Sequence, residues 1–221
     1  MKRFFNRLFF FAGGLLAAYV GIVRPILARW NATDDEVLGP QPGDDLVRRP
    51  LLQTTQSILI QAPAEKVWPW LVQIGYGRGG FYSYDQLERA AGLKDLQSAM
   101  HINPELQKLQ VGDSLPISPV TPMTVEVLKP NRALVLHILM SPFTARPLPA
   151  NNPPEPWMDW SWAFLITPLN DYACRLTSRV RAIYSPYFLL WPLMALVVEP
   201  ASFVMDHKML ATIKLRAEGS N

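Results

Sequence analysis

The stretch Ser57–Gly75, SILIQAPAEKVWPWLVQIG, places a strand signal directly before a helix signal. The run from Gln56 to Gln61 is aliphatic and bounded by polar residues, which predicts a β-strand. Pro63 suits the first turn of a helix because its missing N–H costs nothing there, and Glu65 favours the positive end of the helix dipole. Apolar residues then recur at helical spacing, although Pro69 should kink this helix. They are Val67, Trp68, Trp70, Leu71 and Ile74.

A glycine-rich loop follows, in which Gly75, Gly77 and Gly80 have the spacing G-x-G-x-x-G. A dinucleotide cradle needs a strand before the glycines and a helix after them, so that backbone N–H groups meet the pyrophosphate. Here the glycines follow a helix and lead to a second predicted helix, Tyr84–Ala91. The loop is therefore interpreted as a joint between two helices and not as a nucleotide site.

The second half of the chain predicts an antiparallel sheet. One proline-rich stretch, residues 141–157, forbids regular pairing and predicts a long irregular loop. In the last strand, arginine and threonine side chains alternate with mostly apolar ones, so we expect one solvated face and one covered face. The C-terminal segment 188–218 is the candidate cover. The expected strands are 123–128, 133–140, 160–167 and 175–184.

Composition limits the classes of function. About half of the 221 residues are hydrophobic and the formal charge is +3, with no basic stripe of the nucleic-acid-binding type. The single cysteine, Cys174, excludes an intrachain disulfide and a cysteine-based zinc site. His101, His137 and His207 have no short metal-binding spacing. His207 lies beside Asp206 and Lys208 in the C-terminal segment, which predicts a solvated helix face there. We therefore expect no metal, no cofactor and no nucleic-acid partner.

The N-terminus is predicted to be a membrane anchor, residues 1–30. Lys2, Arg3 and Arg7 precede an uncharged run from Leu8 to Val23, and further arginines follow it. Flanking arginines can extend this slightly short run across a bilayer. A cleaved signal peptide is the alternative, but no cleavage pattern follows the run. Basic residues on both sides do not fix the orientation.

Residues 31–50 are expected to be a linker. Thr33 and Glu36 have the spacing of a capping box, which predicts a short helical turn. Proline and glycine dominate the residues after that turn. The folded domain is then expected over residues 51–218.

The pattern I-x-I-x-A-P-x-x-x-V-W-x-x-L within Ser57–Gly75, the block GRGGFYSYDQLE and the closing EPASFVMDHKMLATIKLRAE resemble the START-like, or SRPBCC, superfamily. The second and third blocks are similar to those of a membrane-anchored bacterial subgroup. The resemblance implies an α+β helix-grip fold, with a curved antiparallel sheet around a long C-terminal helix and a deep apolar cavity between them. It also implies a single-pass protein of the bacterial plasma membrane. It supplies no catalytic residue.

Two groups of residues are candidates for ligand contact in such a fold. Arg78, Tyr82, Tyr84 and His101 would lie near a mouth of the cavity; packing between helices is the alternative role. The second group comprises candidate lining residues, for which ordinary core packing is the alternative. They are Trp160, Trp162, Phe164, Phe203, Met205 and Met209. The apolar run Tyr187–Val198 is either a buried helix or a patch that dips into the membrane surface.

The leading functional hypothesis is a membrane-tethered carrier or sensor for a lipid-like or other apolar small molecule. A second hypothesis is a cyclase- or hydrolase-type enzyme, with its acid or base drawn from Tyr82, Tyr84, Asp85 or His101. A third is a structural protein whose interior is simply filled.

Overall fold

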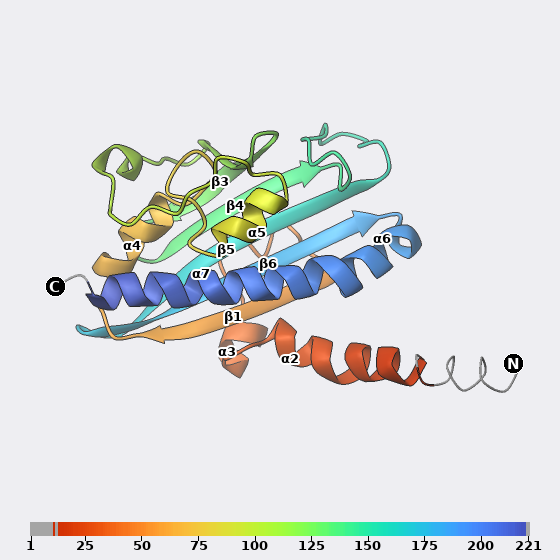
Figure 1. The fold of residues 1–221 in the computed structure, drawn as a ribbon, viewed down its shortest axis with the longest axis horizontal. Helices are drawn as coiled ribbons and strands as arrows, with labels where there is room; N and C mark the ends of the chain where they lie inside the picture. Colours follow the sequence, from red (N-terminus) through yellow and green to blue (C-terminus); the bar gives the residue numbers. More distant parts are fainter. Residues whose placement is uncertain (1–10, 12, 220–221) are drawn as a thin grey trace, which may run out of the picture.

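Strand β1 (Leu52–Ile60) and helix α4 (Ala64–Val72) form from the stretch Ser57–Gly75 and the residues just before it. Pro63 is the N-cap of α4, and Pro69 lies inside the helix, which ends three residues later. The computed structural model describes residues 11 and 13–219 (Figure 1). The strand-to-helix transition predicted from the sequence is therefore present.

Six strands form one antiparallel sheet in the order β1-β6-β5-β4-β3-β2. The proline-rich stretch runs between β4 and β5 as the expected irregular loop, with one isolated bridge to β4 at Pro147. The sheet agrees with the predicted architecture and adds β2, which the sequence did not reveal. The remaining strands are β2 (Ser114–Ser118), β3 (Thr121–Lys129), β4 (Ala133–Met140), β5 (Trp157–Asn170) and β6 (Ala173–Ser185).

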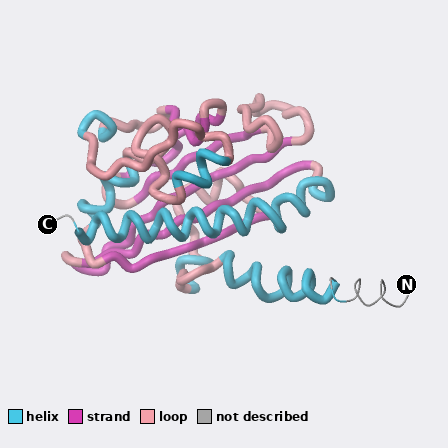
Figure 2. The backbone as a smooth tube through the Cα atoms, viewed as in Figure 1, coloured by secondary structure: helices cyan, strands magenta, loops and turns pink. Residues whose placement is uncertain are grey.

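A long helical segment crosses the inner face of the sheet (Figures 1 and 2). It consists of α6 (Tyr187–Leu193), η3 (Met194–Val198) and α7 (Glu199–Gly219). Together with α4, it encloses the main hydrophobic core. The short helices α5 (Asp85–Ala90) and η2 (Pro104–Gln107) lie in the connection between α4 and β2. A six-stranded antiparallel sheet with a long C-terminal helix is the arrangement expected of a helix-grip fold.

The helix is wound more loosely at η3, where hydrogen bonds join residues five apart. Glu199 N–H donates to the carbonyl of Met194 in this π register. Pro200 would donate next to Ala195, but proline has no N–H. The Tyr19 hydroxyl donates to the Ala195 carbonyl instead, at 2.6 Å. The N-terminal helix thus supplies the donor that Pro200 lacks.

The outer face of the sheet is covered, contrary to the expectation of a solvated face. The segment 31–50, expected as a linker, contains α3 (Asp34–Leu38) and packs on this face. Arg179 points outward from β6 as predicted, yet it is only 2% exposed because it pairs with Asp44 at 2.7 Å. Alternation along a strand assigns side chains to two faces, but it does not show that another segment covers one of them.

Glu36 holds this covering segment in place. The predicted capping box is present, with Thr33 N–H donating to Glu36 at 2.8 Å and Glu36 N–H donating to Thr33 at 3.2 Å. The same carboxylate accepts two hydrogen bonds from Arg175, at 2.7 and 2.9 Å. Burial opposes its charge, but the hydrogen bonds from Arg175, Thr33 and Ser57 lower the pKa of Glu36 to about 2. Glu36 therefore joins α3 to the sheet as a carboxylate.

The N-terminal helix covers Gly13–Ala28 in the described part of the chain and includes η1 (Tyr19–Val23) and α2 (Arg24–Ala28). Lys2, Arg3 and Arg7, the basic residues that precede the apolar run of the predicted anchor, lie outside the described residues. By length and composition, one described helical stretch could cross a membrane, and it is Tyr187–Gly219. The α7 part of this stretch packs against β1, α4 and β6, so length and composition alone do not make it a membrane span.

Candidate ligand cavity

A cavity of about 450 Å³ lies between the inner face of the sheet and the segment η3–α7. Its volume falls within the usual range for small-molecule sites, roughly 300–1,000 Å³. Leu52, Val180 and Ala182 line it from β1 and β6, and Met158, Trp160 and Trp162 from β5. Apolar residues of the helical segment form the opposite wall: Met194, Val197, Val198, Ala201, Met205 and Met209.

Aromatic rings form one end of the sheet wall. Trp160 and Trp162 stack with their ring centroids 6.2 Å apart, and Trp162 contacts Phe164 at 4.7 Å and Phe81 at 6.4 Å. Residues two apart on a strand share a face, so Trp160, Trp162 and Phe164 of β5 all point inward. This part of the wall is therefore aromatic and almost wholly apolar.

The cavity reaches the protein surface beside the start of α7. Val197, Ala201 and Ser202 line the cavity and are also exposed. Val197 and Ala201 are four positions apart and so lie on one side of the helical segment. Val197 at this mouth belongs to the same helical segment as exposed apolar residues of α6, among them Phe188, which is 81% exposed.

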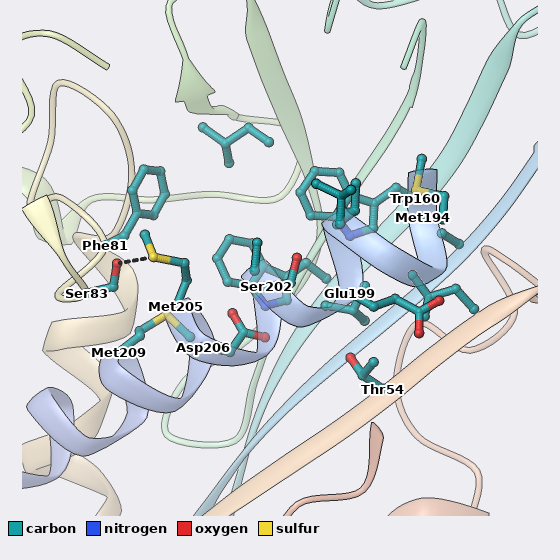
Figure 3. A pocket seen from close by; sticks show the side chains of 18 of the residues that line it. Thr54, Phe81, Ser83, Trp160, Met194, Glu199, Ser202, Met205, Asp206 and Met209 are labelled. Atoms are coloured by element: carbon teal, nitrogen blue, oxygen red, sulfur yellow. Dashed lines mark hydrogen bonds between the residues drawn. The ribbon is translucent and has the colours of Figure 1, made fainter. Parts of the chain in front are cut away.

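Polar groups in the cavity are few, and three of them are carboxyls: Glu88, Glu199 and Asp206. Figure 3 shows Glu199 and Asp206 on the helical wall. No lysine, arginine or histidine is among the described residues that line it. Glu199 receives two hydrogen bonds from Arg24, at 2.5 and 2.8 Å. Glu88 accepts one from the Ser83 hydroxyl, and burial raises its pKa.

Asp206 lies on α7 in the middle of the apolar wall and is only 8% exposed. The indole Nε1–H of Trp162 donates to Ser178 Oγ at 3.0 Å, and the Ser178 hydroxyl donates to Asp206 Oδ2 at 3.4 Å. Burial raises the pKa of Asp206 to about 7, although the Ser178 hydrogen bond acts in the opposite direction. The cavity thus contains a carboxyl that is substantially protonated near neutral pH.

Four of the predicted lining residues, Trp160, Trp162, Met205 and Met209, lie in the cavity wall. The other two lie elsewhere. Phe164 is fully buried behind Trp162 as core packing. Phe203 faces the N-terminal helix, where it lines a separate small hollow and stacks on His207 at 6.0 Å.

None of the four residues expected near a mouth lines this cavity. Arg78 donates hydrogen bonds to the backbone carbonyls of Val72, Ile74 and Leu106. It therefore binds the chain around the end of α4 and not an anionic ligand in the cavity. Tyr82 is 1% exposed and donates to the Trp70 carbonyl at 3.0 Å. Tyr84 and His101 lie on the surface.

The glycine loop closes on itself between α4 and α5. Gly75 and Gly80 exchange two backbone hydrogen bonds of 3.0 Å. Gly80 has a φ of +71°, and an added Cβ would lie 2.8 Å from the Cα of Ser98. The glycines therefore serve a tight turn and close packing, which agrees with their interpretation as a joint between helices.

Asp206 and Glu88 were missed as cavity residues by the sequence reasoning. Asp206 was assigned with its neighbours to a solvated face. Its spacing contained the opposite signal, since Ser202 precedes it by four residues and Met209 follows it by three, which places all three on one helix face. Ser178 could not be found this way because its role depends on pairing across two strands.

Among the described residues, no group of three or more histidine, cysteine, aspartate or glutamate side chains could hold a metal ion. The histidine best placed for a charged interaction is His137, whose Nε2 lies 2.6 Å from Asp159 Oδ1. This pair lies on β4 and β5, outside the cavity.

Several solved structures are similar to this chain at low identity. Protein MLL2253 from Mesorhizobium loti has a TM-score of 0.42 and 15% identity, over 77% of this chain and 99% of that one. A polyketide cyclase-like protein from Corynebacterium glutamicum has a TM-score of 0.39 and 16% identity, over 73% and 88%. Norcoclaurine synthase from Thalictrum flavum has a TM-score of 0.40 and 12% identity, over 77% and 95%.

No protein-family model and no curated protein matches the sequence. With TM-scores below 0.5, the structural matches are similarities in outline only. The functional conclusion rests on the cavity.

Proposed function

We propose that this protein is a membrane-tethered carrier or sensor that holds a lipid-like or other apolar small molecule in the cavity between the sheet and α7. The single observation that carries this proposal is the cavity itself, about 450 Å³ in volume and lined mainly by aliphatic, aromatic and methionine side chains. Each methylene group that a ligand buries there contributes about 0.8 kcal/mol. Such walls favour apolar ligands of many kinds.

The exposed apolar surface near the mouth supports the membrane part of the proposal. Phe188, Leu189 and Val197 are each more than half exposed on α6 and η3. The N-terminal helix, which presents Leu15, Ile22 and Ile26 to solvent in the same way, packs beside this segment through Tyr19. An apolar ligand that leaves a bilayer at this patch would meet the mouth without crossing water. This is the advantage that a tether provides.

Asp206 favours a second candidate, a cyclase- or hydrolase-type enzyme acting on an apolar substrate in the same cavity. A carboxyl whose pKa has been raised to about 7 can donate a proton near neutral pH. Tyr82, Tyr84, Asp85 and His101 do not line the cavity, so the acid in this version is Asp206.

The test is to identify what the full chain carries. The protein is extracted from host membranes with a styrene–maleic acid polymer, so that no detergent competes for the cavity. Its bound small molecules are then extracted and quantified by mass spectrometry. Ser202→Trp places a large side chain at the mouth, and Leu215→Trp places the same side chain at an exposed position on α7 that does not line the cavity.

We expect a near-stoichiometric apolar compound in the wild type and in Leu215→Trp, and a large loss in Ser202→Trp. Equal amounts in all three proteins would show that the compound sits outside the cavity, which contradicts the proposal. Conversion of the recovered compound on incubation with the protein would favour the enzyme.

A further inference from the structure

The ionisable side chains that line the cavity are all acidic. Glu88 approaches from α5, Asp206 from the middle of α7 and Glu199 from its beginning, whereas no basic side chain is among the described lining residues. Arg24, which contacts the Glu199 carboxylate, is already paired with it by two hydrogen bonds. An anionic head group inside this cavity would meet three carboxyls and no free cation, so fatty acids and phosphates are poorly suited to it.

The hydrogen-bond chain on the sheet side fixes how Asp206 can act. Trp162 Nε1 can only donate, so Ser178 Oγ accepts from it. The hydroxyl proton of Ser178 is then directed to Asp206 Oδ2. Because Oδ2 is engaged as an acceptor, the proton of a neutral Asp206 belongs on Oδ1. The carboxyl therefore presents a donor to whatever fills the cavity beside it (Figure 3).

Building on the proposed ligand-binding function, we propose that the cavity selects an uncharged apolar ligand bearing an acceptor oxygen, such as a ketone, aldehyde or ester. Asp206 holds this oxygen by donating its Oδ1 proton. A hydrocarbon of the same shape leaves that donor unpaired in an apolar wall, and an unsatisfied buried polar group is costly. The discrimination comes from this difference, while the surrounding apolar side chains supply most of the affinity.

The protonation behaviour of the site agrees with a donor role. Burial raises the pKa of Asp206 to about 7, and it also raises the pKa of Glu88 on the facing element. Glu199 is the other ionisable group of the cavity wall, and Arg24 compensates its charge. His207, the next residue on α7, faces away toward Trp30, with the ring centroids 4.3 Å apart. Preference for an acceptor oxygen should therefore weaken as pH rises through about 7.

Four naphthalenes of matched shape test this selectivity. 2-Acetylnaphthalene carries the acceptor oxygen, and 2-isopropenylnaphthalene replaces that oxygen with a methylene group. 2-Naphthoic acid supplies an anion and 1-(2-naphthyl)ethylamine a cation. Each compound competes with the uncharged fluorophore N-phenyl-1-naphthylamine for the full chain in lipid nanodiscs held by a scaffold protein, at several pH values between 5.5 and 8.5. The signal of nanodiscs without the protein is subtracted.

At pH 5.5 we expect the ketone to bind about tenfold tighter than its hydrocarbon isostere, and the acid to bind weakest. Tenfold corresponds to about 1.4 kcal/mol, within the range of one buried hydrogen bond. The ratio of ketone to hydrocarbon affinity should fall by pH 8.5. Asp206→Asn offers an amide donor at every pH, so its ratio should stay high and constant. Asp206→Leu should bring the ratio close to one.

Asp171→Asn is the matched control, because it makes the same change at an exposed turn between β5 and β6. It should reproduce the wild-type ratios. Equal affinity for the ketone and the hydrocarbon in the wild type would overturn the inference while leaving an apolar binding site in place. Tightest binding of the amine, lost in Asp206→Asn, would also overturn it, since Asp206 would then be an anionic partner for cations. If neither the fluorophore nor any naphthalene bound, the proposed function itself would fail.

Discussion

Arg24 of the N-terminal helix and Glu199 at the start of α7 form a bidentate ion pair, with Nε–Oε2 and Nη2–Oε1 distances of 2.5 and 2.8 Å. The Glu199 side chain is 6% exposed and also lines the cavity. A fixed, two-bond pair of this kind resists rotation as well as separation. The helix proposed as the anchor and the edge of the proposed binding site are therefore joined directly.

Arg24→Leu should destabilise the protein, because it leaves the Glu199 carboxylate buried without its partner. Breaking such a pair costs about 3 kcal/mol. The double variant Arg24→Leu/Glu199→Leu removes both charges and should recover much of that loss. The free energy of unfolding in urea, measured for the two single variants and the double variant, checks this. A double variant as unstable as the sum of the singles would show that the two residues act independently.

Glu36→Gln should weaken the attachment of α3 to the sheet at neutral pH. Glu36 has its pKa lowered to about 2 in the fold, against 4.5 as the ordinary value, so its stabilising contribution is present above about 4.5. That contribution disappears as pH falls through about 2. We expect a loss of about 2 kcal/mol at pH 7, measured by urea unfolding. The difference between wild type and variant should vanish near pH 2, and a difference independent of pH would contradict the ionic role.

Asp206 should make the fold less stable as pH rises. Its pKa is about 7 in the fold and 3.8 as the ordinary value, so the folded state holds the proton more tightly. Stability is therefore fully present below about 3.8 and declines as pH rises through about 7. At pH 8 the free energy of unfolding of Asp206→Asn should be higher than that of the wild type by a few kcal/mol, on the order of 1.4 kcal/mol per pKa unit. Thermal unfolding of both proteins between pH 4 and 8 measures this difference. If the stability of the two proteins changed with pH in the same way, the prediction would be wrong.

The patch Tyr187–Val198 should contact lipid when the full chain is reconstituted in vesicles of phosphatidylethanolamine and phosphatidylglycerol. A polarity-sensitive fluorophore attached at Phe188→Cys should shift its emission to shorter wavelength in these vesicles. Tyr172→Cys, 79% exposed at the other end of β6, is the control and should not shift. Cys174 will not compete for the label, because it is fully buried and burial raises its pKa to about 11. Identical emission at both positions would place the patch in water.

The sequence predicted the elements whose signals are local. The turn from β1 into α4 follows from Pro63 and the apolar spacing after it, and the α3 capping box follows from Thr33 and Glu36. The inward aromatic residues of β5 follow from alternation of period two, which is why Trp160 and Trp162 were correctly assigned to one face. Such signals depend only on neighbouring residues.

Features that depend on distant residues were not predicted. The pairing of Arg179 with Asp44 joins positions 135 residues apart, and the sequence pattern showed only that Arg179 points outward. Asp206 was assigned to a solvated face since an aspartate beside a histidine and a lysine is usually hydrated. Its burial follows from the way β6 and α7 meet, which no local pattern specifies. The predicted roles of Arg78 and Tyr82 depended in the same way on where the glycine loop packs.

The separation between the covering segment and β6 also has a consequence for the order of folding. Glu36 and Asp44 are synthesised long before their partners Arg175 and Arg179, which lie 139 and 135 residues further along the chain. Strand β6 is also the element that pairs with both β1 and β5. Until it emerges, β1 has no neighbouring strand, and residues 31–50 lack the two arginines that hold them to the sheet. The last strand to be made therefore joins β1 to the sheet and supplies the ion-pair partners of the covering segment in one step, and a chain cut short before β6 can do neither.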